Sequence, residues 1–192
     1  MKKLLWCVPV AIALLTLSCS TGWKIYSDDM FHGKRLLQEE EYAEARTDFL
    51  RAADAQKWPS AYAFAATASY KMGDLASAER YIGEAERLDG KDYSYVRVLG
   101  YKALTLLREG KEREGRETLQ RYAQILRSIS SPKSATQIEI WMRQQPMDLP
   151  GLEKLIDQQV YRYESDIEQY QETGTGFYNR PGNFRGGPSV VP

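Results

Sequence analysis

Hydrophobic and polar positions along the chain follow two patterns, a short apolar run at the start and a helical period after it. The run covers residues 4–17, and charged residues are frequent from Lys24 onwards. From Ser27 to about Leu126 the chain is rich in Ala, Leu, Glu, Arg, Lys and Gln, and its few glycines fall between periodic segments. This pattern predicts an all-α fold with helices throughout residues 27–126.

Two more helices are predicted beyond this segment. Ser131 and Pro132 form an N-cap followed by a proline at the first helical position, and a longer helix is expected from about Pro150 to Gln171. One side of the longer helix carries an apolar stripe of Leu152, Leu155, Ile156, Val160, Tyr163, Ile167 and Tyr170. We expect this helix to cap the preceding helices, and the alternative is that its stripe docks a partner helix as a coiled coil.

An internal repeat is found when residues 27–126 are compared with themselves. Small residues recur in the two helices of three successive units, at Gly33 and Ala45, Ala66 and Ala78, and Ala103 and Gly115. A turn glycine stands at Gly73 and Gly110, and Glu40 takes its place in the first unit. The pattern resembles the tetratricopeptide repeat, a helix-turn-helix unit of about 34 residues. The resemblance implies a solenoid of about three helix pairs with C-terminal capping helices.

The start of the chain has the anatomy of an export signal. Two lysines precede the apolar run, which is too short to span a bilayer comfortably. The stretch Leu15–Cys19 resembles the lipobox of bacterial lipoproteins, in which the cysteine is diacylated and becomes the new N-terminus. Thr16 and Leu17 depart from the commonest form of that motif. An ordinary signal peptide with another cleavage site, or an uncleaved anchor, is the alternative.

The cysteine count supports lipidation of Cys19. Cleavage removes Cys7 and leaves Cys19 as the one cysteine of the mature chain. An unpaired thiol is unusual in an oxidising compartment, and acylation removes it. Ser20 is of the residue type that, in many Gram-negative lipoproteins, permits transfer to the outer membrane. We therefore expect a lipid-anchored envelope protein, on the periplasmic face of the outer membrane.

These expectations divide the chain into five segments. They are a signal peptide (1–18), a lipid-anchored tether (19–26), a repeat domain (27–126), a C-terminal helical extension (127–172) and a disordered tail rich in Gly and Pro (173–192). The tether is short and holds the domain close to the bilayer. Trp23 and Tyr26 lie in it, and aromatic rings of this kind favour the membrane–water boundary. The alternative is that they cover the outer face of the first repeat.

The repeat resemblance also implies a binding groove, because first helices of successive units line a concave surface in this family. The corresponding positions are Lys34, Gln38, Thr67, Tyr70, Lys71, Arg97, Leu104 and Arg108. Four of them are basic in a chain with 26 basic and 26 acidic residues, which favours a protein partner with acidic or C-terminal carboxylate groups. Tyr70 is the expected hot spot. The alternative is that the cations only solvate a surface.

The sequence contains few motifs that indicate catalysis or the binding of a metal or cofactor. His32 is the single histidine, and no nucleophile with a plausible base, zinc-ligand spacing, phosphate loop or dinucleotide fingerprint is found. The balanced charge does not favour nucleic acid. The sequence therefore predicts no catalytic residue, metal site or cofactor, and a scaffold or assembly factor in the envelope. The alternative is an enzyme or carbohydrate-binding protein of the envelope, whose site has no sequence signature.

Overall fold

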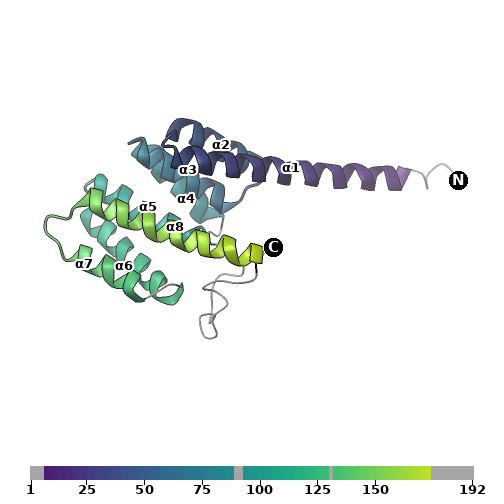
Figure 1. Cartoon of the computed structure of the whole chain (residues 1–192). Helices are drawn as coiled ribbons and strands as arrows, with labels where there is room; N and C mark the ends of the chain where they lie inside the picture. The colour runs from purple at the N-terminus through teal and green to yellow at the C-terminus, as the bar shows by residue number, and fades with distance from the viewer. Residues whose placement is uncertain (1–6, 89–92, 130–131, 174–192) are drawn as a thin grey trace.

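A computed structural model describes residues 7–88, 93–129 and 132–173 of the chain, and these residues form eight helices and no strand. The helices are α1 (Cys7–Gln38), α2 (Tyr42–Ala55), α3 (Pro59–Lys71), α4 (Leu75–Arg87), α5 (Tyr95–Arg108), α6 (Glu112–Ile129), α7 (Pro132–Met142) and α8 (Leu149–Thr173). The predicted all-α class is confirmed, including both C-terminal helices (Figure 1). Nearly all of the predicted tail lies outside the described residues.

The first six helices pack as three sequential pairs, α1 with α2, α3 with α4 and α5 with α6. The turn inside each pair contains one residue with a positive φ angle: Glu40 at 65°, Gly73 at 80° and Gly110 at 75°. In all three turns the next backbone N–H donates to a carbonyl five residues back, at 2.9 Å. Glu40 thus adopts a backbone conformation that favours glycine, which explains how the first unit forms the same turn.

Small residues allow the close approach within each pair. A Cβ atom added at Gly33 would lie 2.7 Å from the Phe49 ring, and one at Gly115 would lie 2.6 Å from Leu107. Both distances are shorter than real Cβ contacts, so the neighbouring helix would have to move. The alanines predicted for equivalent positions, Ala45, Ala66, Ala78 and Ala103, are all buried.

The long C-terminal helix crosses the preceding helices, as Figure 1 shows for α8 and α5. The apolar stripe predicted for α8 is largely buried, with Leu152 and Ile156 fully inaccessible. A Cβ atom added at Gly100 of α5 would lie 2.7 Å from Ile156, so the glycine lets α8 come close. The helix that follows α6 in the array is α7. Helix α8 packs on α5 of the last pair and touches α7, and its charged side chains reach Lys71 of α3 and Lys34 of α1.

The predicted tether is helical. Its residues 19–26 and the predicted first helix from Ser27 belong to one helix, α1, which begins at Cys7 and ends at Gln38. Gly22 lies inside this helix and close to the end of α2: an added Cβ would lie 3.1 Å from Gln56 Nε2. The first turns of α1 extend away from the other helices (Figure 1). Within the described part of the chain, no helix has the length and hydrophobicity needed to span a bilayer.

Candidate binding cleft

The surface formed by α1, α3 and α5 faces a row of carboxylates on α8. At its centre Arg97 of α5 donates two hydrogen bonds to Glu164, at 2.8 and 2.7 Å, and a third to Thr67 at 3.2 Å. Its guanidinium lies 3.9 Å from the centre of the Phe64 ring. Both charged side chains are more than nine-tenths buried, at 9% and 8% exposure. Two opposite charges buried in this way satisfy each other and lock α8 to α5 and α3.

A second set of contacts holds the beginning of α8. Lys71 at the end of α3 donates to Glu153 at 2.5 Å and to Asp157 at 2.6 Å. The Tyr70 hydroxyl donates to Glu153 at 3.2 Å, and the Tyr101 hydroxyl forms a short hydrogen bond to Asp157. Three polar groups from α3 and α5 therefore share two carboxylates of α8 through four hydrogen bonds.

Burial and the nearby carboxylates shift the pKa values of Tyr70, Tyr101 and Lys71. Burial raises the pKa of Tyr70, and the nearby Glu153 raises it further. Burial and Asp157 likewise hold the pKa of Tyr101 well above its ordinary value. Burial lowers the pKa of Lys71, but hydrogen bonds to Asp157 and Glu153 outweigh that effect and leave the pKa raised. All three groups keep their protons at neutral pH.

Most of the predicted groove residues are engaged within the chain. Thr67, Tyr70 and Leu104 are buried, at 1%, 1% and 0% exposure. Arg108 donates to the backbone carbonyl of Tyr70 at 3.2 Å and lies over its ring. Lys71 and Arg97 pair with carboxylates of α8, whereas Arg108 is exposed at the end of α5. Five of the eight predicted residues, Lys34, Gln38, Thr67, Lys71 and Arg97, line an open space beside α8.

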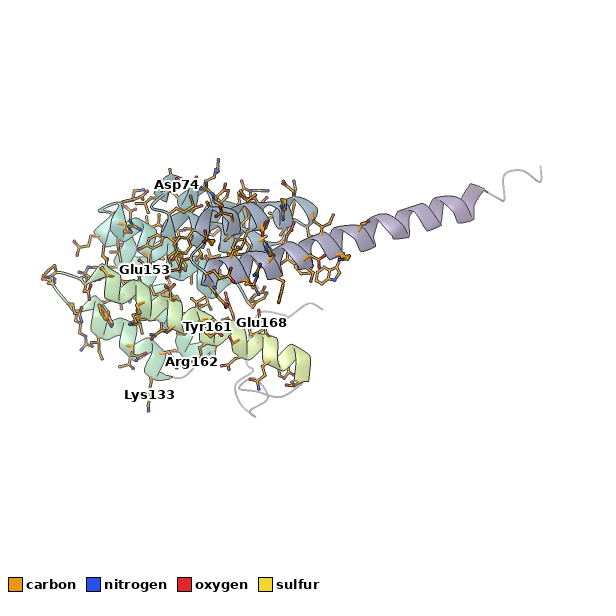
Figure 2. All side chains as sticks on the ribbon, turned by 45° about the horizontal axis from the view of Figure 1, so that its top comes forward. Asp74, Lys133, Glu153, Tyr161, Arg162 and Glu168 are labelled. Carbon is orange, nitrogen blue, oxygen red and sulfur yellow. The ribbon has the colours of Figure 1, made fainter. Side chains whose placement is uncertain are left out.

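That open space is a cleft between α1 and α8, which we call the α1–α8 cleft. No Cα atom of α1 lies within 8 Å of one in α8, so side chains alone line the gap. One part has a volume of about 340 Å³ and the neighbouring part about 530 Å³, and Lys34, Gln38 and Glu168 line both. The Lys34 ammonium bridges the cleft to Glu168 at 2.6 Å. Figure 2 labels Glu168 and Tyr161 on α8.

The rims of the cleft carry exposed aromatic side chains. Phe31 of α1 is 76% exposed beside the larger part, and Tyr161 of α8 is 62% exposed beside the smaller one. Sequence analysis missed Tyr161 and all four carboxylates of α8. The available signal was the spacing of Glu153, Asp157, Glu164 and Glu168, which places these acids near one flank of the apolar stripe.

The aromatic residues near the N-terminus form a separate cluster. Trp23 stacks on Tyr26 with 5.7 Å between ring centres, and Trp58, which precedes α3, lies 5.2 Å from both rings. Tyr26 is buried, and its hydroxyl lies 2.6 Å from Ser60 Oγ. Trp23 remains 50% exposed. Of the two residues predicted to meet a membrane, Trp23 is therefore at the surface and Tyr26 packs beneath it.

His32, the single histidine of the sequence, lies in a small charged cluster with α2. His32 forms a short hydrogen bond to Asp48, which also accepts from Arg51 at 2.7 Å. Among the described residues, no group of three or more His, Cys, Asp or Glu side chains is placed to hold a metal ion. No protein-family model, curated protein or solved structure matches this chain.

Proposed function

We propose that this chain is a lipid-anchored envelope protein that is related to tetratricopeptide-repeat proteins and binds another protein in the α1–α8 cleft. Three features support the repeat relationship. The helices pack in sequential pairs, the three turns share one backbone conformation at Glu40, Gly73 and Gly110, and small residues occupy equivalent contact positions. These features describe one helix-turn-helix unit used three times.

The observation that carries the binding proposal is the pairing of polar and aromatic groups along the cleft. Among the described residues, the ion-pair partner of Lys34 is a partly exposed carboxylate, Glu168, and such a pair contributes about 0–1 kcal/mol. A carboxylate of a partner can therefore replace Glu168 at small cost. Phe31 and Tyr161 offer exposed aromatic area on the two sides of the cleft, and tyrosine is one of the residue types enriched in binding hot spots. An extended peptide segment with an acidic and an apolar side chain fits these groups.

Membrane attachment rests on the signal at the start of the chain. Residues 4–17 supply the apolar run, and Cys19 follows in a context similar to a lipobox. Ser20 favours the periplasmic face of the outer membrane by the residue-type rule for Gram-negative lipoproteins. The role that follows is a scaffold or assembly factor that holds its partner beside the envelope membrane.

Photo-crosslinking from the cleft tests the proposal. A photoreactive amino acid replaces Gln38, Tyr161 or, as a matched exposed control outside the cleft, Glu44 of α2 in the full-length protein in intact envelopes. We expect Gln38 and Tyr161 to give the same crosslinked protein and Glu44 to give none of it. The added change Lys34→Glu, which reverses the charge in the cleft, should reduce that product at least several-fold. The same products from all three positions, or none from the cleft positions, would contradict cleft binding.

A further inference from the structure

The connection between α2 and α3 meets α1 beside the predicted lipidation site. The space that a side chain at Gly22 would need is bounded by Gln56 Nε2 at 3.1 Å and the Ala55 carbonyl oxygen at 3.4 Å. Gly22 and Trp23 follow Cys19 by three and four residues in the same helix. With a rise of 1.5 Å per residue, Trp23 stands about 6 Å from Cys19 along the helix axis.

Trp58 brings a second indole to this point of the molecule. Its ring lies 5.2 Å from the ring of Trp23 and is 38% exposed, and Ile25 nearby in sequence is 48% exposed. Lys57, next to Trp58, is also exposed. Tyr26 supports both indoles from beneath and is itself fixed by Ser60. The two tryptophans are therefore rigidly held together, although 35 residues separate them in the sequence.

We propose that Trp23 and Trp58 form one membrane-contacting surface, with a phospholipid bilayer as its occupant. The inference rests on lipidation of Cys19, which is part of the proposed function, and does not depend on the α1–α8 cleft. An acyl anchor at Cys19 holds both indoles at the depth of the headgroups, where tryptophan is enriched in membrane proteins. Lys57 adds a cation beside anionic headgroups.

The consequence is a domain attached at two places. A covalent anchor alone lets a protein rotate and tilt about the attachment point. A second contact, supplied by the connection between α2 and α3, fixes which face of the domain turns towards the bilayer. Trp58 is the residue that distinguishes the two cases, because Trp23 enters the interface with Cys19 in either of them.

Brominated phospholipids, which quench tryptophan fluorescence on contact, provide the test. Lipidated protein is reconstituted in phosphatidylethanolamine/phosphatidylglycerol vesicles with or without bromine on the acyl chains. Trp6 is removed with the signal peptide, and each variant retains one of the other tryptophans: Trp23, Trp58 or, as the control from α7, Trp141. The Trp141 ring packs beside Gly151 at the beginning of α8 and serves as the indole away from this surface.

We expect Trp23 and Trp58 each to lose about half of their emission in brominated vesicles and to shift to the blue, while Trp141 is unchanged. Quenching of Trp23 without Trp58 would overturn the second contact and leave lipid anchoring intact. A Trp58 that is unquenched in vesicles but crosslinks to a protein in envelopes would assign the surface to a protein instead. Failure of the lipidated protein to float with vesicles would contradict both the anchor and this inference. Loss of the cleft crosslinks with retained quenching would contradict the proposed partner site alone.

Discussion

Two of the ion pairs that join α8 to other helices, Arg97 with Glu164 and Lys34 with Glu168, differ in almost every physical respect. Arg97 and Glu164 are 9% and 8% exposed and share two short hydrogen bonds. Lys34 and Glu168 are 29% and 50% exposed and share one. The same family resemblance suggested both basic residues as groove residues. Both pairs line the smaller part of the cleft, but burial separates them: the first pair is almost inaccessible to solvent, and solvent reaches the second. Residue type at a groove position therefore does not identify a binding residue until the occupant of the groove is known.

The largest effect is expected from removing the buried cation. Arg97→Met leaves Glu164 charged and without its main partner in a buried site, which should lower the free energy of unfolding by about 3–5 kcal/mol. Urea denaturation of the single variant and of the wild type measures this change. The double variant Arg97→Met, Glu164→Leu removes both charges and should recover most of the loss. A single variant as stable as the wild type would show that the contrast between the two ion pairs is wrong.

Two buried tyrosines differ in whether their hydroxyl groups have a hydrogen-bond partner, and this difference can be tested. The Tyr101 hydroxyl is bonded to Asp157, whereas the Tyr122 hydroxyl, also buried, has no partner among the described residues. Tyr101→Phe removes a hydrogen bond to a charged group and should cost about 1.5–3 kcal/mol. Tyr122→Phe should be neutral or slightly stabilising, because no hydrogen bond is lost. Equal effects of the two changes in urea titrations would contradict the assigned network.

Contact between α8 and α5 depends on Gly100. Gly100→Ala places a methyl group 2.7 Å from Ile156 and should cost about 1–3 kcal/mol through overpacking. Gly83→Ala is the matched control, since nothing lies within 4 Å of the added atom in α4, and it should gain up to about 1 kcal/mol from helix propensity. Thermal melts of both variants measure the difference. Similar melting temperatures would mean that α8 does not press on α5.

Stability should fall at alkaline pH. Burial raises the pKa of Tyr70, Tyr101 and Tyr122 above the ordinary value of 10.0, so the folded chain holds these protons more tightly than the unfolded chain. The stability they contribute is present below pH 10 and is lost as the pH rises above it, by up to about 1.4 kcal/mol per pH unit for each tyrosine. Urea midpoints between pH 8 and 11 measure the slope. Tyr122→Phe should reduce the slope without changing stability at pH 8, and an unchanged slope would refute the linkage.

The smallest effect on stability is expected in the cleft. Lys34→Met removes a cation whose partner remains half exposed, so the free energy of unfolding should change by about 0–1 kcal/mol. The same change should reduce crosslinking from Gln38 strongly. A large loss of stability would show that Lys34 stabilises the fold as Arg97 does. Unchanged crosslinking would show that Lys34 does not take part in partner binding.

Local features of the fold were predictable because they depend on neighbours in the sequence. Small residues such as Gly33 and Ala78 repeat at the spacing of a helix pair, and Gly73 and Gly110 mark the turns. Even the turn at Glu40 follows from the register, although its residue type gives no hint of a positive φ.

The course of α8 was not predictable in the same way. Its apolar stripe indicates one buried face, and both the end of the array and the concave surface offer apolar area to cover it. The choice depends on charges far apart in the sequence, such as Arg97 with Glu164 and Lys71 with Glu153. The spacing of apolar residues along α8 does not reveal which charged residues of other helices will pair with its carboxylates. Trp58 was missed for the same reason, since only the fold brings it to Trp23.

Because α1 is one unbroken helix, it fixes the distance between Cys19 and the cleft. A flexible tether would let the domain sample every position within its reach, but a helix acts as a ruler of fixed length. Lys34 follows Cys19 by 15 residues in α1, which is at most about 22 Å along the axis. With the lipid anchor proposed at Cys19, the cleft would lie within a set distance of the lipid surface. Under that proposal a partner segment must project into this layer to be captured, and segments farther from the bilayer are out of range.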